Sequence, residues 1–168
     1  RADVTTLLGD SQTGGSLKEE LRTVLAVREF ASTELALPEN DSYRSYVDVG
    51  RPYVLWNVVA TGEFSLVPKS WCYPFTGCVA YRGYYTESDA RAYAAKLESE
   101  GLDVMVGGVR AYSTLGWFDD PVLNTMLEQP FTYLAGLIFH ELAHQRIYIK
   151  DDTTFNESFA VAVEREGV

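Results

Sequence analysis

The sequence predicts a single α+β domain over residues 1–168. Three observations carry this prediction: helical periodicity near the N-terminus, strand-forming residues with one helix among them in the middle, and helices at the end. The chain has 168 residues, of which 46% are hydrophobic, so it can bury one core and is too short for two comfortable domains. No internal repeat or mid-chain linker interrupts it.

The N-terminal third predicts a helix followed by strands. Residues 1–16 are polar and glycine-rich, so we expect a flexible lead-in. Ser16 and Glu19 have the spacing of a capping box, and apolar residues then recur at helical spacing until Pro38 ends the pattern. Residues 53–71 are rich in Val, Trp, Phe and Leu and predict two strands joined by a turn.

The middle of the chain predicts a strand-helix-strand unit. A tight loop over 72–78 leads into a short strand over 79–85. Thr86 then begins a helix, with an acidic capping-box residue three positions later, and Gly101 ends it. The next strand is predicted over 102–112.

The C-terminal third is predicted to be mainly helical. After a loop over 113–121, a helix is expected to begin near Pro121. A second helix over 131–148 is either continuous with it or separated from it by a proline. A polar connector over 150–153 then leads to a last helix that begins near Thr154.

The charge balance excludes two classes of partner. The net charge is -10, whereas nucleic-acid binding and docking on an anionic membrane both need a basic surface. No apolar run approaches the roughly 20 residues of a transmembrane helix. Because the chain begins at Arg1, we expect it to be a piece of a longer polypeptide.

The strongest chemical signal is His140-Glu141-Leu142-Ala143-His144, which holds both histidines of the chain. Residues four apart lie on one face of a helix, so both imidazoles can reach a single metal ion. Glu141 points to the edge of that site and suits a general base acting on a metal-bound water. Apolar neighbours predict that this helix is buried, and buried polar groups need a partner, for which zinc is the simplest candidate.

A third zinc ligand must be a carboxylate or a thiolate, because no other histidine exists. Glu157 lies 13 residues after His144, on a helix that a short connector allows to fold back antiparallel. Glu164 lies two turns further on the same face and is a candidate to orient an imidazole. The arrangement resembles that of the Glu-type zinc peptidases, the broad group of thermolysin and the zinc aminopeptidases, with a shorter spacer.

A resemblance covers most of the chain from Arg28 to Gly167. The chain resembles the bacterial family described as putative zinc aminopeptidases, a predicted metallopeptidase family of Gram-negative bacteria. The matching strings are REFASTELALPEN, SYVDVGRPYVLWNV, WCYPFTGCVAYRGYY, DVMVGGVRAYSTLGWFDDP and IFHELAHQRIYIKDDTTFNESFAVAVEREG. The resemblance implies a zincin-like fold, a bound zinc ion and a location in the periplasm or cell envelope.

The fold expected from this resemblance is a small mixed sheet packed on the active-site helix, with a second helix that bears Glu157. Similar proteins often begin with a secretion or lipoprotein signal, so a lipid anchor upstream of the chain is one alternative for its attachment. We expect a peptide substrate, no nucleic acid, and no membrane insertion by this segment.

Cys72 and Cys78 have two interpretations. With the histidines they imitate a Cys2His2 set, but 61 residues separate Cys78 from His140, which is too long for a zinc finger. We favour a disulfide over free thiols if the protein is exported.

The region just upstream of the motif helix is the predicted substrate-binding surface. Residues 107–113 can form an edge strand above the zinc, where glycines such as Gly108 let a substrate backbone approach and pair. Tyr112, Ser113 and Trp117 are assigned to the same surface, although an aromatic stripe is also typical of a plain core. The pair Asp119 and Asp120 most resembles a helix cap and is alternatively a ligand for a substrate amino group.

Two functions follow from the sequence. In the first, a metallopeptidase, Glu141 activates the water, and Tyr112 and Tyr148 are candidate donors to the oxyanion. We expect aminopeptidase action, with Trp117 and Phe118 blocking the groove beyond one substrate residue. In the second, the chain is a zinc-containing binding or scaffold module of the cell envelope without turnover.

Overall fold

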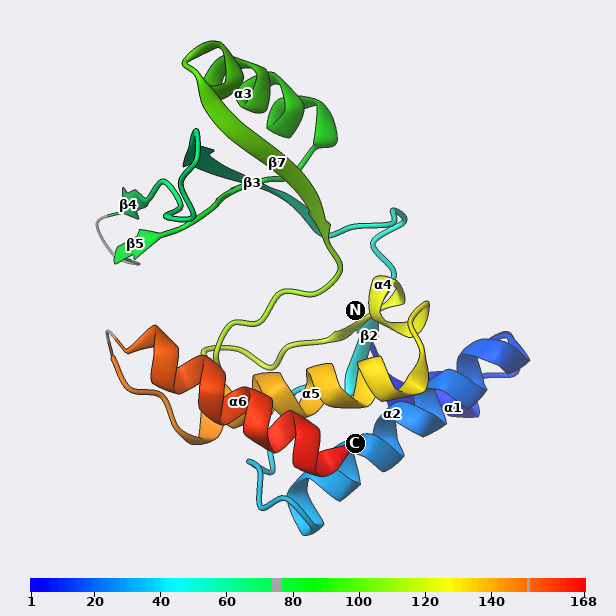
Figure 1. Ribbon diagram of the computed structural model, residues 1–168. Coiled ribbons are helices and arrows are strands. Elements are labelled where there is room, and N and C mark those ends of the chain that lie inside the picture. The colour runs from blue at the N-terminus through cyan, green and yellow to red at the C-terminus, as the bar shows by residue number, and fades with distance from the viewer. Residues whose placement is uncertain (74–76, 151) are drawn as a thin grey trace. The chain divides into compact units, whose positions relative to one another are not determined.

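The computed structural model describes residues 1–73, 77–150 and 152–168 (Figure 1). The protein is a mixed α/β molecule with small sheets. It divides into two compact units: residues 1–50 with 113–168, here called the helical unit, and residues 51–112, here called the sheet unit. A single domain over the whole chain stays a prediction.

The helical unit holds a small mixed sheet and five helices in its described part. Strand β2 is central, antiparallel to β1 and parallel to β8. The elements are β1 (Ala2–Asp3), α1 (Val4–Gly9), α2 (Gly15–Thr33), β2 (Ser45–Val47), β8 (Val122–Leu123), α4 (Asn124–Leu127), α5 (Phe131–Arg146) and α6 (Thr153–Gly167).

The expected flexible lead-in over residues 1–16 is wrong. Ala2–Asp3 pairs with β2, and the Asp3 side chain accepts a hydrogen bond from the backbone N–H of Thr6 at 3.1 Å, which caps α1. Val4 is fully buried and anchors the segment in the core. One apolar side chain and one cap therefore order a segment that its composition alone assigns to a loop.

Helix α2 is confirmed, but its predicted cap is not. The residue before the helix is Gly14, which forms no side-chain cap hydrogen bond, and Ser16 lies inside the helix. The buried face consists of Leu21, Val24, Val27, Arg28 and Ala31, which recur at helical spacing.

Helices α5 and α6 lie side by side and run in opposite directions (Figure 1). Half of the residues of α5 are buried, and its buried face includes Leu134, Ile138, Phe139 and Leu142. Helix α5 begins after Pro130, so the sequence pattern corresponds to two separate helices, α4 and α5. The antiparallel return predicted for the last helix is confirmed.

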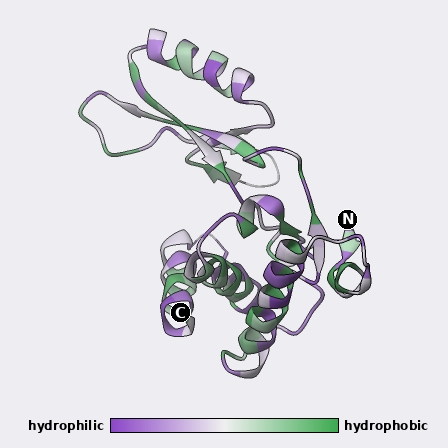
Figure 2. Cartoon of the chain, turned by 90° about the vertical axis from the view of Figure 1, so that its right-hand side faces the viewer, coloured by the Kyte–Doolittle hydropathy of each residue, from purple (hydrophilic) through white to green (hydrophobic). Residues whose placement is uncertain are grey.

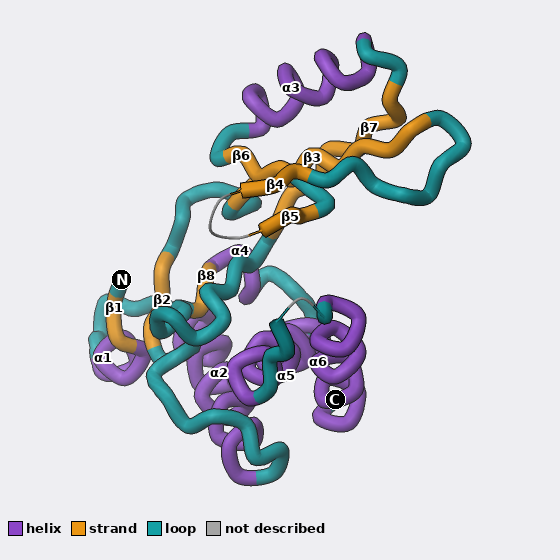
Figure 3. Tube along the Cα trace, turned by 90° about the vertical axis from the view of Figure 1, so that its left-hand side faces the viewer, coloured by secondary structure: helices purple, strands orange, loops and turns teal. Residues whose placement is uncertain are grey.

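The sheet unit consists of a three-stranded sheet, a hairpin and one helix. The strand order is β6-β3-β7, and both outer strands are antiparallel to β3. Figure 3 shows α3 along one face of this sheet. The elements are β3 (Leu55–Gly62), β4 (Trp71–Tyr73), β5 (Gly77–Val79), β6 (Arg82–Tyr84), α3 (Glu87–Ser99) and β7 (Leu102–Val109).

The predicted strand-helix-strand unit is confirmed as β6, α3 and β7, with β3 inserted between the two strands. Its signals are also confirmed: the Thr86 hydroxyl accepts the Asp89 N–H at 3.3 Å, and Gly101 follows the helix with φ of 84°. Of the two strands predicted over 53–71, the first is β3. The second is largely absent, because β4 begins only at Trp71, the last residue of the predicted range.

Cys72 and Cys78 form a disulfide between β4 and β5, in agreement with the pairing that the sequence favours. The central residues of the predicted 72–78 loop, 74–76, lie outside the described residues, as does residue 151 of the predicted connector. The described helices mix hydrophobic and hydrophilic residues along their length (Figure 2). None of these helices combines the length and apolar character that crossing a membrane requires.

Candidate metal centre

Helix α5 places the two histidines one turn apart on one face. The Nε2 atoms of His140 and His144 are 3.2 Å apart, and their ring centroids are 4.8 Å apart. His144 is only 7% exposed, and His140 is partly buried. This is the geometry that the i, i+4 spacing predicts for a helix.

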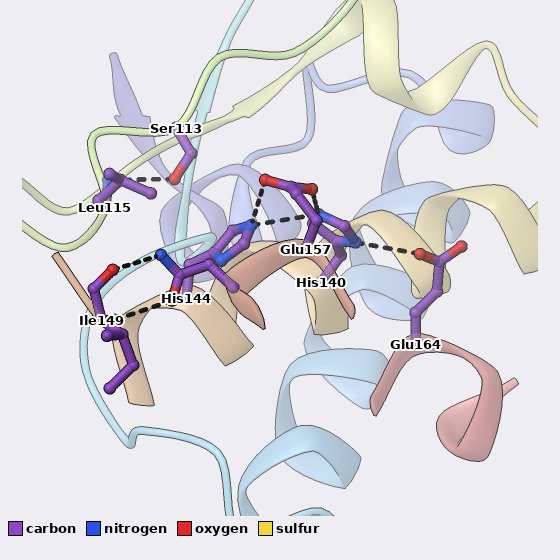
Figure 4. A network of polar contacts seen from close by, with 8 residues as sticks. Ser113, Leu115, His140, His144, Ile149, Glu157 and Glu164 are labelled. Carbon is purple, nitrogen blue, oxygen red and sulfur yellow. Dashed lines mark hydrogen bonds and ion pairs between the residues drawn. The ribbon is translucent and has the colours of Figure 1, made fainter. Parts of the chain in front are cut away.

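Glu157 closes the group from the first turns of α6 (Figure 4). Its Oε2 lies 3.3 Å from His140 Nε2, and its Oε1 lies 3.6 Å from His144 Nε2. Ligand atoms about 2.0 to 2.1 Å from a tetrahedral metal ion lie about 3.3 Å from one another. The three side chains, whose ligand atoms all fall within 4.8 Å, could therefore hold one metal ion.

Asn156 fixes the position of Glu157. Its side chain is buried and makes two hydrogen bonds of 2.8 Å to one residue, accepting the backbone N–H of Ile149 and donating to the carbonyl of Ile149. Asp152 caps α6 by accepting the Phe155 N–H at 2.9 Å. Together they tie the connector to the start of α6. The sequence does not reveal this role of Asn156, because its hydrogen-bond partner is backbone and leaves no sequence pattern.

Glu164 lies on the other side of His140 (Figure 4). Its Oε2 is 3.1 Å from His140 Nδ1, so it can accept a hydrogen bond from the N–H at that position and leave Nε2 to face the cluster. A Cβ at Gly136 would come within 3.1 Å of the Glu164 side chain. A glycine one turn before His140 therefore leaves room for the carboxylate that orients the ring.

The state of His144 also suits a metal ligand. Burial lowers its pKa, although the Glu157 carboxylate opposes that shift. A lowered pKa favours the neutral imidazole, which is the form that binds metals. Within the described residues its buried Nδ1 atom has no hydrogen-bond partner. This nitrogen can carry the ring proton, while the Nε2 lone pair points at His140 and Glu157.

Glu141 lines a cavity of about 210 Å³ together with Tyr133, Leu137, His140 and Glu164. Burial raises the pKa of Glu141, and a hydrogen bond from Ser113 and the neighbouring His140 oppose the shift. Tyr133 was missed by sequence analysis. Its position seven residues before His140, two turns earlier on the same face, is the signal that could have found it.

A family model described as "Putative aminopeptidase" matches residues 1–168. The chain belongs to this family. No curated protein and no solved structure matches the chain. The family description indicates a peptidase and does not name a metal, so the zincin-like fold type stays a prediction.

The predicted tyrosines occupy different places. The Tyr148 ring is exposed, and its centroid lies 6.4 Å from that of His144, one turn beyond the motif. Tyr112 is also exposed and belongs to the sheet unit. Their assignment as oxyanion donors stays a prediction.

The predicted edge strand is shorter than expected. Strand β7 ends at Val109 and lies at one edge of its sheet, whereas residues 110–113 have no regular structure. Gly108 packs against Tyr53, and a Cβ there would collide with that ring. Its lack of a side chain is therefore explained within the sheet unit, and substrate pairing at Gly108 stays a prediction.

The loop from Ser113 to Asp120 belongs to the helical unit. Asp120 is 3% exposed, and its carboxylate accepts the Ser113 hydroxyl at 3.3 Å and the Thr114 N–H at 2.9 Å. Its interpretation as a helix cap is wrong, because α4 begins only at Asn124. The buried carboxylate stabilises the loop instead. Trp117, the predicted wall of the groove, is 86% exposed on this loop.

Proposed function

We propose that this chain is a zinc-dependent aminopeptidase, with His140, His144 and Glu157 as the zinc ligands. One observation carries the proposal: the two imidazole Nε2 atoms lie 3.2 Å apart, and the Glu157 carboxylate faces both of them, with one oxygen 3.3 Å from His140 and the other 3.6 Å from His144. Two imidazoles and one carboxylate are a ligand set of catalytic zinc sites that leave one position open. Bound there, zinc supplies a Lewis acid and makes a neighbouring water acidic enough to attack a carbonyl.

The residues of the chain have separate roles in this proposal. Glu141 takes the proton of the attacking water and returns it to the leaving amine, because it follows a ligand directly and lines the cavity. Glu164 holds His140 in the orientation that directs Nε2 to the metal. Tyr148, Tyr112 and, from the cavity wall, Tyr133 are the candidate donors to the developing oxyanion.

An aminopeptidase must also recognise a free amino group. Asp119 is the carboxylate that we propose for this contact, since Asp120 is buried and already bonded and Glu164 is bonded to His140. Trp117 and Phe118 are proposed to limit the groove to one residue before the scissile bond. The disulfide favours an oxidising compartment, and we propose the periplasm or cell envelope.

The test combines metal analysis with a panel of aminoacyl and internally quenched peptides. We expect one zinc per chain and cleavage of peptides with free N-termini. Glu141→Gln should abolish cleavage with zinc still bound, because it removes the base and keeps the ligands. Glu166→Gln, on the exposed side of α6, is the matched control and should leave cleavage unchanged.

Three results would contradict parts of this proposal. Protein prepared without chelator that holds no metal would remove the zinc site. Equal cleavage of N-acetylated and free peptides would change the assignment to an endopeptidase. Bound zinc without cleavage of any peptide would favour the non-catalytic module.

A further inference from the structure

A cavity of about 210 Å³ lies beside the candidate metal centre, within the helical unit. Its walls are Tyr133, Leu137, His140 and Glu141 of α5 and Glu164 of α6. One ordered water needs about 15 Å³, and pockets for drug-sized ligands begin at about 300 Å³. A space of the observed size therefore suits a single side chain of a substrate.

The α5 residues of this cavity form one stripe that leads to the metal centre. Tyr133, Leu137 and Glu141 are spaced four residues apart, so they follow one another along a single face of the helix. His140 belongs to both the cavity and the metal centre: its Nδ1 lies 3.1 Å from Glu164, and its Nε2 lies 3.3 Å from Glu157 (Figure 4). A side chain in the cavity would therefore belong to a substrate residue bound next to the proposed metal site.

The charged walls of the cavity are acidic. Glu141 and Glu164 both line it, and none of the five lining residues is a lysine or an arginine. Glu157, across His140, adds a third carboxylate. When ionised, these three side chains carry more negative charge than one divalent metal ion neutralises. A cation in the cavity would balance the excess, whereas an acidic side chain would be repelled.

The other walls suit the uncharged part of a basic side chain. The Tyr133 side chain is half-exposed, and an aromatic face attracts a guanidinium or an ammonium group. Leu137 offers an apolar surface to the methylene groups that precede the charge. Glu164 keeps its contact with His140, because a cation is attracted by its charge and does not need the oxygen that faces His140 Nδ1.

The charge of the whole helical unit favours the same class of ligand. The sheet unit has six basic and six acidic residues, so the helical unit carries the full net charge of -10. A field of this sign attracts cationic peptides, and salt screens it. Long-range attraction and the walls of the cavity therefore both select a positively charged substrate.

We propose that this cavity is a specificity pocket for a basic side chain, so that the substrates are peptides with lysine or arginine at the residue bound beside the metal centre. The inference rests on the proposed function, because it names the substrate class of that site. For an aminopeptidase this residue is the N-terminal one. Asp119 keeps the separate task of binding the free amino group.

The kinetic test uses pairs of aminoacyl substrates that differ in charge and little in shape: arginine with citrulline, and lysine with norleucine. We expect kcat/KM to be about 10-fold higher for the charged member of each pair at low salt. The preference should decrease as salt is added, because Tyr133 and Glu164 leave the cavity partly open to water. Equal kcat/KM within each pair would overturn the inference.

Three variants locate the preference. Glu164→Gln keeps an acceptor for His140 and removes one charge of the cavity. An effect through His140 changes both members of a pair alike, so the ratio within the pair reports the charge, and we expect it to fall about fivefold. Leu137→Lys places a cation in the cavity and should remove the preference. Glu166→Gln removes an exposed carboxylate of α6 outside the cavity and is the matched control, which should keep the ratio. An equal fall in all three variants would assign the preference to the overall charge and overturn the pocket.

Calorimetry gives a readout that does not depend on turnover. The wild type is titrated with argininamide and with citrullinamide, its neutral counterpart. Tighter binding of argininamide that is weakened in Leu137→Lys supports the pocket, and equal binding of the two amides overturns it. If peptides are cut without a preference for basic residues, the proposed function stands and this inference fails. If no peptide is cut and argininamide still binds more tightly, the proposed function fails and the cavity remains a site for a cationic side chain.

Discussion

The two units of this protein differ in what they bury. The sheet unit has an apolar core of Val58, Ala60, Ala90, Ala94 and Leu97. Among the described residues, every buried polar or charged residue belongs to the helical unit: Arg28, Ser42, Ser45, Asp120, Thr125, His144 and Asn156. Burying polar groups costs free energy. Their concentration in the helical unit, which also carries the candidate metal centre, therefore indicates that side chains are buried there for reasons other than packing alone.

Several of these buried groups hold loops next to the metal centre. The Arg28 guanidinium donates to the carbonyls of Pro38, Asn40 and Ser42. Asn40 in turn donates from Nδ2 to Gln145 Oε1 at 2.7 Å, on the residue that follows His144. The sheet unit, in contrast, is stabilised by strand pairing, by the packing of α3 and by one disulfide.

The largest expected effect comes from His144→Ala. Removal of one of three ligands should abolish zinc binding and peptide cleavage. Stability should fall by about 4 kcal/mol under conditions where free zinc exceeds its Kd about a thousandfold, since zinc then stabilises the folded state. Metal analysis, the peptide assay and thermal unfolding measure the three effects.

Chelator provides the control for this variant. It should lower the melting temperature of the wild type toward that of His144→Ala and leave the melting temperature of the variant unchanged. A chelator effect of equal size on both proteins would mean that His144 does not bind the metal, and would remove the link between the helical unit and zinc.

Local patterns could be predicted because they repeat along the chain. Helical spacing identified Leu21, Val24 and Ala31 on the buried face of α2. The capping residues Thr86 and Gly101 marked the two ends of α3. The separation of His140 and His144 on one helix face placed two candidate ligands, and the short connector suggested the antiparallel return that brings Glu157 to them.

The buried polar ties could not be predicted from the same patterns. An arginine such as Arg28 is expected at the surface, but this one is fully buried. Its guanidinium donates to carbonyls of a loop 10 to 14 residues later, and no sequence pattern indicates these partners. Tyr43 adopts a left-handed φ of 63°, and no turn motif in the sequence indicates this conformation. The contact of Ser113 with Asp120 depends on the path of a loop, and such contacts leave no periodic signal.

Arg28→Met should produce the next largest effect. The substitution keeps much of the side-chain volume but leaves several buried carbonyls without a donor, so we expect a loss of about 3 kcal/mol in the free energy of unfolding. Arg22→Met on the exposed face of α2 is the matched control and should change stability by less than about 0.5 kcal/mol. Urea unfolding measures both, and equal stability of the two variants would show that the buried cation does not hold the loop.

The double variant Cys72→Ser with Cys78→Ser tests the sheet unit. The disulfide closes a loop with a sequence separation of 6, and removing it should cost about 2 kcal/mol, chiefly through the greater freedom of the unfolded chain. Zinc content and peptide cleavage should persist, because the proposed ligands all belong to the helical unit. Reductant on the wild type should reproduce the stability change. Loss of zinc in the double variant would contradict the assignment of the metal site to the helical unit alone.

The smallest effect is expected at high pH from Tyr43→Phe. Burial holds the pKa of Tyr43 well above its usual value, and the charges of Glu141 and Asp120 add to the shift. Below about pH 10 the phenol is neutral in both the folded and the unfolded state. Above that pH the unfolded state releases the proton and the folded state keeps it, so the stability of the wild type should fall by about 1.4 kcal/mol per pH unit from this group.

Phenylalanine cannot ionise, so Tyr43→Phe should lose this part of the slope between pH 10 and 11, measured by urea unfolding. Tyr46→Phe is the graded control. Burial also raises the pKa of Tyr46, but less strongly, so its removal should flatten the slope less. Identical slopes for the wild type and Tyr43→Phe would mean that the phenol is open to water. Tyr43 would then not belong to the buried polar groups that distinguish the helical unit from the sheet unit, whose core is apolar.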